Sequence, residues 1–421
     1  MGTSTLSRRE LLKLLGLTVP ALGGCAYLRI DLMSPYLRSE TIDSPEKEQE
    51  VVSKGRLEWS EDKRVRVLYV KGTPYERGYQ HGYLLRKEVQ ANLGYLWESA
   101  LSKFHSEELF AEAYERQRLY MPTEFVEEMH GLAHGSKMPL EVIHALHALP
   151  EITEWGGKRH LKQVLDKMMT GEIGTSCSNM CADGKATADG GMYTVRILDW
   201  GLHKISKLHE YPLITVSRPD KGYASANISW VGFIGAVSGM NERGITLGEM
   251  GYGDPPGETL DGKPMVFMMR EILEYADSLK DVRRIIQTSQ PTNSYIFLMS
   301  DGKRREAELY VRDPHRFEVH EPGKEIKGDG HDVKAIQDVV YGGHYTDRMT
   351  EGLEGSYGKI TPELLMKELI PKFAMRSNFQ DVVYDPVKLQ FWVANAKSAT
   401  ERAAEQQYTH FDLKGALQSF T

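Results

Sequence analysis

The chain has 421 residues, of which 41% are hydrophobic and 26% charged, so it can bury a substantial core and suits one large domain or two ordinary ones. Its formal net charge is -7 and its Lys and Arg residues are scattered, which excludes the basic surface that nucleic-acid binding requires. Only three cysteines are present, too few for a disulfide framework in a chain of this length.

The first 25 residues resemble an export signal. The pair Arg8-Arg9 precedes an apolar run over residues 14–24, and the last four residues of the segment, ending at Cys25, resemble a lipobox. The apolar run is shorter than the roughly 20 residues that span a bilayer. We therefore predict a twin-arginine lipoprotein signal over 1–25, with Cys25 lipidated and the protein anchored at the outer side of the cytoplasmic membrane. The alternative is a short buried helix with a coincidental arginine pair.

Residues 26–60 follow as a predicted tether. They are rich in charged residues and contain Ser-Pro pairs at 34–35 and 44–45, a composition that disfavours a packed core. We expect this segment to be extended or poorly ordered.

Residues 61–176 are predicted to be mostly helical. An alternating strand over 64–69 leads into the glycine-rich segment 72–82. Apolar residues then recur at helical spacing: Val89, Leu93, Leu96, Ala100 and Phe104. Further helices are expected at about 123–134, ended by Gly135, and at 139–149, opened by Pro139 and stopped by Pro150.

Residues 177–421 are predicted to contain mainly strands with helices among them. The expected strands are 192–198, 213–217, 224–230, 234–238, 245–250, 295–300, 307–311 and 317–320, and the expected helices are 264–276, 280–288 and 361–373. A final hairpin is expected over 382–394. This order of elements predicts an α+β domain in which two antiparallel sheets are covered by helices.

A hairpin over residues 174–200 contains the most informative residues. Two Asp-Gly pairs, at 183–184 and 189–190, supply the turn chemistry. A reversal near Ala188 would place position 177 opposite position 199 and bring Cys177 close to Arg196 and Asp199. Strict strand alternation puts Arg196 and Asp199 on opposite faces, so we expect a bulge or a strand end if both serve one site.

A thiol at Cys177 needs help to act as a nucleophile, because a free thiol with a pKa near 8.5 is only partly ionised at neutral pH. Arg196 can supply positive charge. If the chain is cut before Cys177, the freed α-amine, with an ordinary pKa of about 7.7–8.0, can act as the base, and Asp199 can orient it. The alternatives are a buried structural cysteine and an Arg196–Asp199 ion pair. Cys181 is predicted to be a core residue.

Several motifs occur in a recognisable order. They are Cys-Ser at 177–178, Ala-Thr-Ala-Asp-Gly at 186–190, Arg-x-x-Asp-Trp at 196–200, and the segments 72–82, 238–244, 293–301 and 381–386. Together they resemble the isopenicillin N acyltransferase-like family of N-terminal-nucleophile hydrolases over about Arg64 to Ala396. The likeness departs at Ile197, where the family often has Asn, and at Ser178, where it often has Thr.

The resemblance implies a four-layer αββα fold and a precursor that cuts itself between Ser176 and Cys177. It implies that the new Cys177 terminus attacks a linear N-acyl amide, forms an acyl-thioester and passes the acyl group to water or an amine, without a cofactor. Asp199 would hold the α-amine and Arg196 would lie against the thiol.

Three further residues are carried over with the resemblance. Asn293 is the candidate oxyanion donor and Asn241 a weaker one, while Arg348 matches a late arginine near the family's pocket. Each has a simpler interpretation. Asn241 suits a hairpin turn, Asn293 can bond backbone at the start of a strand, and Arg348 can be a surface residue.

Two other functions remain open at this point. The first is a lipid-anchored binding protein without catalytic activity, which would bind an acylated ligand or partner. The second is a metalloenzyme that uses His130 and His134 on one predicted helix, with Glu127, and with His144 and His147 on the next. No His-Glu-x-x-His motif is present, so we expect no metal. The loop at 251–257 lacks a phosphate-loop lysine and is expected to border a pocket.

Overall fold

The computed structural model describes residues 42–421 except 159–174, 205, 253–256, 258 and 328–331. The predicted export signal, Cys25 and the first part of the tether therefore lie outside the described residues. Helix α2 (Pro45–Ser53) begins at the capping residue Ser44, and strand β1 (Arg56–Trp59) follows it. The expectation of an extended or poorly ordered tether is thus wrong from Pro45 onward, because these residues pair and pack with the body of the protein.

The first β layer begins at one edge with β1 and β2 (Arg66–Gly72) and continues through β5 (Pro212–Pro219), β6 (Ser225–Trp230), β7 (Gly239–Asn241) and β8 (Thr246–Leu247). Strands β9 (Glu249–Gly251), β10 (Tyr295–Asp301), β11 (Glu306–Arg312) and β12 (Phe317–His320) extend it. The Leu298 N–H donates to the Gly248 carbonyl at 2.9 Å, which joins the two sets. We predicted an antiparallel sheet here, but strands β2 and β5 are parallel. The long connection between them supplies the crossover that parallel strands need.

The second β layer is antiparallel throughout. Its order is β13 (Val339–Gly343), β3 (Thr175–Gly184), β4 (Gly190–Trp200), β14 (Gln380–Asp385), β15 (Gln390–Asn395) and β16 (Thr409–Asp412). The predicted hairpin is β3–β4, but Cys177 lies opposite Leu198 and Ser176 opposite Asp199. The expected pairing of 177 with 199 is therefore wrong by one residue. Gly184 pairs with Gly190, so the hairpin turns one residue earlier than predicted, and the irregularity between Ala182 and Gly184 offsets only half of the resulting shift.

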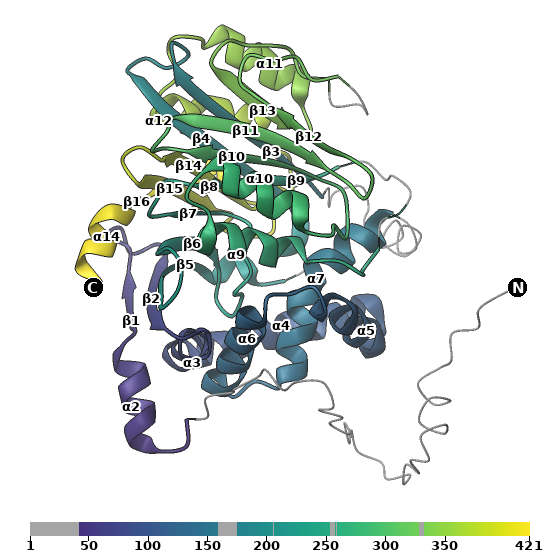
Figure 1. Cartoon of the computed structure of the whole chain (residues 1–421), viewed down its shortest axis with the longest axis vertical. Helices are drawn as coiled ribbons and strands as arrows, with labels where there is room; N and C mark the ends of the chain where they lie inside the picture. Colours follow the sequence, from purple (N-terminus) through teal and green to yellow (C-terminus); the bar gives the residue numbers. More distant parts are fainter. Residues whose placement is uncertain (1–41, 159–174, 205, 253–256, 258, 328–331) are drawn as a thin grey trace, which may run out of the picture. The chain divides into compact units, whose positions relative to one another are not determined.

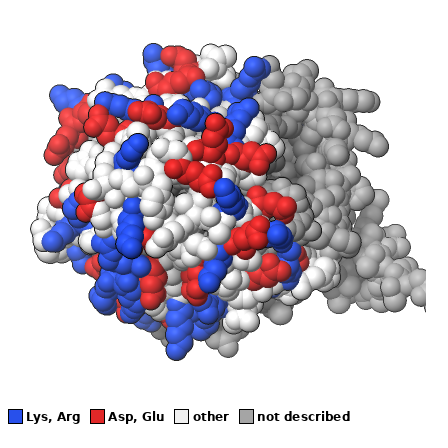
Figure 2. Space-filling view, turned by 90° about the horizontal axis from the view of Figure 1, so that it is seen from above, with Lys and Arg blue, Asp and Glu red and all other residues white. Residues whose placement is uncertain are grey.

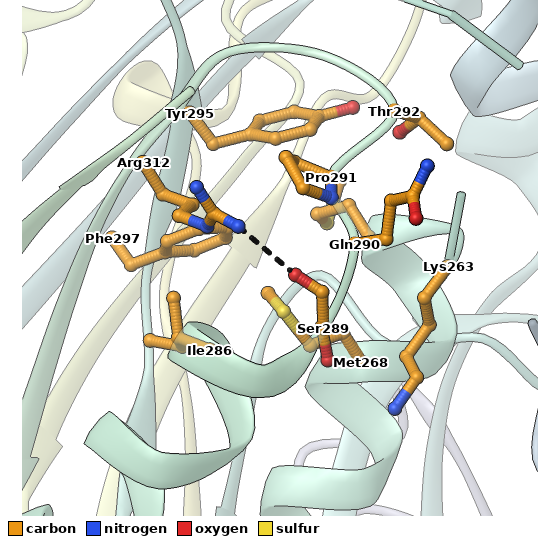
Figure 3. A pocket seen from close by; sticks show the side chains of 11 residues that line it. Lys263, Met268, Ile286, Ser289, Gln290, Pro291, Thr292, Tyr295, Phe297 and Arg312 are labelled. Carbon is orange, nitrogen blue, oxygen red and sulfur yellow. Dashed lines mark hydrogen bonds between the residues drawn. The ribbon is translucent and has the colours of Figure 1, made fainter. Parts of the chain in front are cut away.

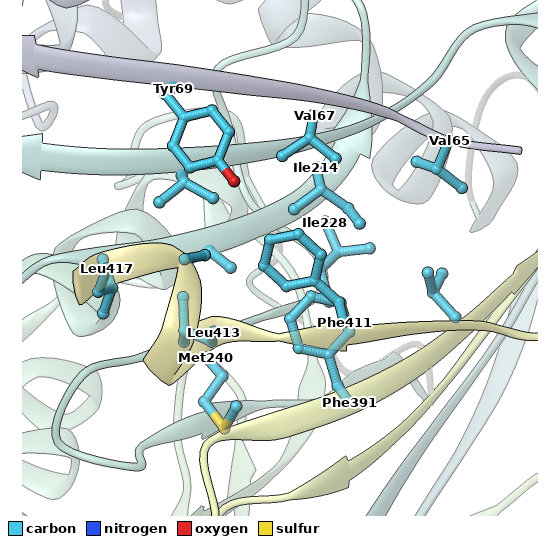
Figure 4. Packing of buried hydrophobic residues seen from close by; sticks show 14 of the residues in the cluster. Val65, Val67, Tyr69, Ile214, Ile228, Met240, Phe391, Phe411, Leu413 and Leu417 are labelled. Atoms are coloured by element: carbon cyan, nitrogen blue, oxygen red, sulfur yellow. The ribbon is translucent and has the colours of Figure 1, made fainter. Parts of the chain in front are cut away.

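The hydrophobic core lies between the two β layers (Figure 4). From the first layer it receives side chains of β2, β5 and β6, such as Val67 and Ile214, and from the second layer side chains of β14 and β15, such as Phe391. The C-terminal helix α14 (Leu413–Ser419) closes one end of this core with Leu413 and Leu417. Burial of apolar surface between the sheets is the main force that holds the layers together.

Helices cover the outer faces of both layers (Figure 1). Helices α9 (Met265–Tyr275) and α10 (Leu279–Thr288) pack on the first layer. Helix α11 (Thr346–Gly355) packs on β13 of the second, next to the helical run of α12 (Pro362–Leu364), η3 (Leu365–Leu369) and α13 (Ile370–Phe373). The predicted four-layer αββα fold is confirmed by this order of layers.

Between β2 and residue 158, the chain is mainly helical. It contains α3 (Pro74–Leu84), α4 (Arg86–Phe104), α5 (Glu107–Arg118), α6 (Thr123–Ser136) and α7 (Leu140–Lys158). Two predicted ends are wrong: Gly135 lies inside α6, and α7 continues through Pro150. The two residues after Pro150, Glu151 and Ile152, are completely buried, so their packing outweighs the cost of the proline.

The expected strand over 234–238 is also absent, because much of the backbone of this loop bonds to side chains and, at Ala236, to helix α9, although the Ser238 carbonyl accepts from the Ile228 N–H of β6. The amide of Asn227 donates to the Gly235 carbonyl at 2.9 Å, and Arg270 donates to the Ile234 carbonyl. The Gly232 N–H donates to Nε2 of His81 at 2.9 Å. No helix among the described residues has both the length and the apolarity needed to cross a bilayer.

Helices α3 and α6 are in backbone contact through two pairs of glycines. A Cβ atom at Gly131 would lie 2.1 Å from the Tyr75 carbonyl, and one at Gly78 would lie 1.9 Å from the Glu128 carbonyl. Gly82 and Gly135 are equally crowded by backbone of the facing helix. Gly78 and Gly82 of segment 72–82 therefore serve helix packing together with Gly131 and Gly135, which explains why Gly135 does not end α6.

We predict that Gly131→Ala lowers the free energy of unfolding by about 1–3 kcal/mol, because α3 and α6 must separate to admit the methyl group. The matched control is Gly94→Ala in α4, where an added Cβ meets nothing within 4 Å. It should gain about 0.5–1 kcal/mol from helix propensity. Urea unfolding of both variants measures the difference, and equal midpoints would contradict the packing argument.

Candidate functional site

Cys177 and Arg196 share one face of the β3–β4 hairpin. Cys177 and Asn179 lie two residues apart on β3, and Asn179 pairs directly with Arg196 on β4. This face points toward the first β layer, since Thr194 on the same face donates to Ser300 of β10 at 2.7 Å. Cys177 and Arg196 are diagonal neighbours on this face, both side chains are buried, and the positive charge of Arg196 lowers the pKa of the Cys177 thiol against the effect of burial. A role of Arg196 at the thiol during a reaction stays a prediction.

Arg196 is held in place by a carboxylate from the facing layer. Its Nη2 donates to Oε1 of Glu249 at 2.5 Å, and its Nη1 donates to the Ile197 carbonyl at 2.9 Å. The Asn179 amide donates to the Glu249 carbonyl at 3.0 Å, so β3 and β9 are joined at this point. Sequence reasoning missed Glu249; its only signal was an acidic residue within an otherwise apolar predicted strand.

Asp199 lies on the opposite face of β4. The register is regular from Arg196 to Asp199, so the bulge that we expected between them is absent. Oδ1 of Asp199 accepts from the Met375 N–H at 3.1 Å, while Oδ2 is buried and has no hydrogen-bond partner among the described residues. The backbone nitrogen of Cys177 lies between the two faces of the sheet. Arg196 therefore shares a face with the side chain of Cys177, while Asp199 lies on the opposite face, and the role of Asp199 toward the Cys177 nitrogen stays a prediction.

Burial controls the protonation of both reactive groups. It raises the pKa of the Cys177 thiol to about 12, although Arg196 partly opposes the shift. Burial and the neighbouring Asp381 also hold the pKa of Asp199 well above its ordinary value. In the uncut chain the thiol is thus protonated at neutral pH, and an additional base is needed to make it a nucleophile.

Asn293 lies just before β10 and is fully buried. Its Nδ2 donates to Oε2 of Glu151 at 2.8 Å, and Glu151 also accepts from the Tyr295 hydroxyl at 3.2 Å and from the Met265 N–H at 2.6 Å. Glu151 belongs to α7, before the predicted cut, and was not singled out from the sequence. No hydrogen bond among the described residues joins the Asn293 side chain to Cys177, so the role of Asn293 as an oxyanion donor stays a prediction.

The surroundings of Asn241 and Arg348 fit a turn residue and a surface residue, respectively. Oδ1 of Asn241 accepts from the N–H groups of Arg243 and Ile245, both at 3.0 Å, and its Nδ2 donates to the Ala276 carbonyl at 2.9 Å. The side chain is thus used in the turn after β7. Arg348 is exposed on α11, with its guanidinium 4.3 Å from the centre of the Tyr345 ring. Their catalytic roles stay predictions.

The second cysteine and the histidines are accounted for by packing contacts. Cys181 is buried and accepts from the Thr194 hydroxyl at 3.3 Å, and neither it nor Cys177 forms a disulfide. Nδ1 of His147 donates to the Ile143 carbonyl at 2.7 Å, and its Nε2 accepts from the Ile234 N–H at 3.0 Å. Both ring nitrogens of His147 are therefore engaged. Within the described ranges no group of three or more metal-binding side chains is present.

A small hollow lies between α9, α10 and the start of β10 (Figure 3). Met268, Ile286 and Phe297 form its apolar wall, and Arg312 lies at its side and donates to the Ser289 carbonyl at 3.3 Å. Thr292 and Tyr295 also line it, and both hydrogen-bond to Glu151. On the face of the molecule seen in Figure 2, acidic and basic residues are interspersed.

Comparisons with known proteins reveal distant relatives. No protein-family profile matches the chain. An uncharacterised protein of Archaeoglobus fulgidus is 28% identical over 272 residues, which cover 57% of this chain and 42% of that protein. Protein dcd1A of Dictyostelium discoideum is 25% identical over 312 residues, 66% of each chain, and dcd1B is 26% identical over 342 residues, 73% of this chain and 63% of dcd1B. The chain thus spans less than two thirds of these relatives.

Solved structures with limited similarity include the following three. An N-acylethanolamine-hydrolyzing acid amidase ortholog of Caenorhabditis elegans has a TM-score of 0.38 and 10% identity, and the match covers 50% of this chain and 93% of that one. A mutant of the conjugated bile acid hydrolase of Clostridium perfringens has a TM-score of 0.37 and 11% identity, with 57% of this chain and 93% of that one covered. A penicillin V acylase of Agrobacterium tumefaciens has a TM-score of 0.30 and 12% identity, with 52% of this chain and 83% of that one covered.

We predict that replacing the Arg196–Glu249 pair by Met and Gln slows alkylation of Cys177 at least about tenfold, because loss of the cation raises the thiol pKa further. Changing both partners avoids a buried unpaired carboxylate. The control is Arg348→Met, which removes an exposed arginine. Mass spectrometry of peptides after iodoacetamide treatment reports the rate, with Cys181 as internal reference. An unchanged Cys177 rate would exclude Arg196 as the group that tunes the thiol.

Proposed function

We propose that the protein is a self-processing cysteine amidohydrolase or acyltransferase of the N-terminal-nucleophile class, which acts on linear N-acyl amides through Cys177. One observation carries the proposal: Cys177 and Arg196 are buried neighbours on one face of the sheet, while on the other face Asp199 has a carboxylate oxygen with no hydrogen-bond partner among the described residues. The motif resemblance to the isopenicillin N acyltransferase-like family supports the same chemistry.

Maturation begins with attack of Cys177 Sγ on the carbonyl carbon of Ser176. The peptide bond becomes a thioester, and the nitrogen of Cys177 takes up the thiol proton and becomes an amine. Water then hydrolyses the thioester, so that Ser176 gains a carboxylate and Cys177 recovers its thiol. The product has a free α-amine within reach of Asp199. An α-amine ordinarily titrates near pH 7.7–8.0 and can therefore serve as a base at neutral pH.

In the catalytic cycle the α-amine accepts the proton of the Cys177 thiol, and the thiolate attacks the amide carbonyl of the substrate. The protonated amine returns the proton to the leaving amine, which leaves an acyl-thioester on Cys177. Water or a second amine then attacks this thioester, with the α-amine again accepting and returning a proton. Arg196 stabilises the thiolate, and Asp199 stabilises the ammonium form that exists between the two proton transfers.

The N-terminal segment supports an exported enzyme. The twin-arginine pair and the lipobox ending at Cys25 fit a protein that is anchored by lipid outside the cytoplasm. We include this localisation in the proposal, and mass spectrometry of the purified chain tests it by detecting a lipid on Cys25.

We predict that the purified protein separates into two fragments on a denaturing gel, the second beginning at Cys177. Cys177→Ala should give one intact band and lose hydrolysis of N-acyl amides by about a thousandfold or more, because the nucleophile and the base are removed together. Cys181→Ala, the matched control, should be cut and active, since that thiol only fills the core.

Edman sequencing of the second fragment identifies the cut. An intact wild-type chain with an unmodified Cys177 and no activity on N-acyl amides would refute the proposal. That result would favour the alternative, a lipid-anchored protein that binds an acylated ligand.

A further inference from the structure

Segment 381–386 was singled out by its motif, but the proposed reaction gives it no role. Its first residue, Asp381, lies on β14 directly opposite Ile197 of β4. Asp199 is two residues from Ile197, so Asp381 and Asp199 are diagonal neighbours on the same face of the sheet. Diagonal neighbours in an antiparallel pair lie about 7 Å apart, within electrostatic reach. Both carboxyl groups are completely buried.

The surroundings of Asp381 are polar but contain little positive charge. The Asn378 amide donates to Oδ1 of Asp381 at 2.8 Å, and the Tyr408 hydroxyl donates to Oδ2 at 3.5 Å. Two cations act on it from farther away: Arg402, which is paired with Glu405 at 2.8 Å, and Arg196, which lies on the other face of the sheet. Neither forms an ion pair with Asp381 within the part of the chain that the structure describes.

Two buried carboxylates with no cation between them cannot both carry a full negative charge at neutral pH. Burial accordingly raises the pKa of Asp381 to about 7, although Asn378 and Tyr408 oppose the shift. The same effect appears at Asp199, whose pKa is raised by burial and then by Asp381. Asp381 therefore loses its proton just below the pH range in which the α-amine of Cys177 titrates.

We infer that Asp381 is a positioning residue of the Cys177 site, which shares a proton with Asp199 at lower pH and adds a second negative charge beside the α-amine when that proton is lost. This inference rests on the proposed function. When Asp381 releases its proton to solvent, a second negative charge reaches the amine and favours the ammonium form. The α-amine, which must accept the proton of the thiol, is then deprotonated only at higher pH.

The test is the pH dependence of kcat/KM in the mature wild type and in Asp381→Asn, with one N-acyl amide as substrate. Asn cannot ionise, and its carbonyl can still accept from Asn378. The rising limb of the profile, which reports deprotonation of the α-amine, should move to lower pH by about half a unit to one unit. The matched control is Asp385→Asn, a buried aspartate on the same strand that pairs with Lys388, and it should leave the limb in place.

An active wild type whose rising limb does not move in Asp381→Asn, or moves to higher pH, overturns this inference and leaves the proposed function intact. If Asp381→Asn does not fold or is not cut, the same pH profile is measured in Tyr408→Phe. This variant removes a hydrogen bond to the ionised carboxylate of Asp381, so Asp381 keeps its proton to higher pH. The rising limb of the profile should then move to lower pH by a smaller amount than in Asp381→Asn, and an unmoved limb overturns the inference. A wild type that is inert and uncut at Cys177 overturns both proposals together.

Discussion

The site depends on the pleat of the β3–β4 hairpin. Successive side chains of a strand point to opposite faces, so Arg196 and Asp199, three residues apart, are separated by the sheet. Cys177 on the neighbouring strand presents its sulfur to one face, while its nitrogen belongs to the backbone between them. The regular register between Arg196 and Asp199 thereby places a cation on the face of the Cys177 side chain and an acid on the opposite face, with no bulge between these two residues.

Each face of that hairpin is completed by a different layer. The thiol face is buried against the first β layer, where Glu249 holds the guanidinium of Arg196. The opposite face, on which Asp381 lies beside Asp199, is covered by the segment around Met375 and Asn378. The cation is thus paired by a carboxylate from the other sheet, while the acid is left with one unpartnered oxygen and an acidic neighbour. This asymmetry suits the proposed reaction, in which the α-amine of Cys177 is released by the cut and becomes positively charged beside Asp199.

The helical part before Cys177 contributes more than a cover for the sheets. Glu151 of α7 receives hydrogen bonds from Tyr295, Asn293 and the backbone of Met265, all of which follow the predicted cut. Buried ion pairs from Arg77 and Arg270 to Glu128 and Glu274 likewise join α3 and α6 to α9. These contacts are satisfied within the fold, so the two parts have reason to stay associated if the chain is cut between them.

The sequence by itself determined the hairpin, the layered α+β class and the grouping of Cys177 with Arg196, because turn residues and period-two alternation act over a few neighbours. Only the tertiary structure decided the register of Cys177 against Leu198, which one irregularity near Ala182 shifts. It also decided the partners of Arg196 and Asp199, since Glu249 and Asp381 come from strands far away in the chain. The tertiary structure also decided the environment of Gly135 and Pro150, which local rules assign to helix ends. Close packing of α3 on α6 outweighs the preference at Gly135, and burial of the next two residues outweighs it at Pro150. Neighbouring residues in the sequence reveal neither the packing nor the burial.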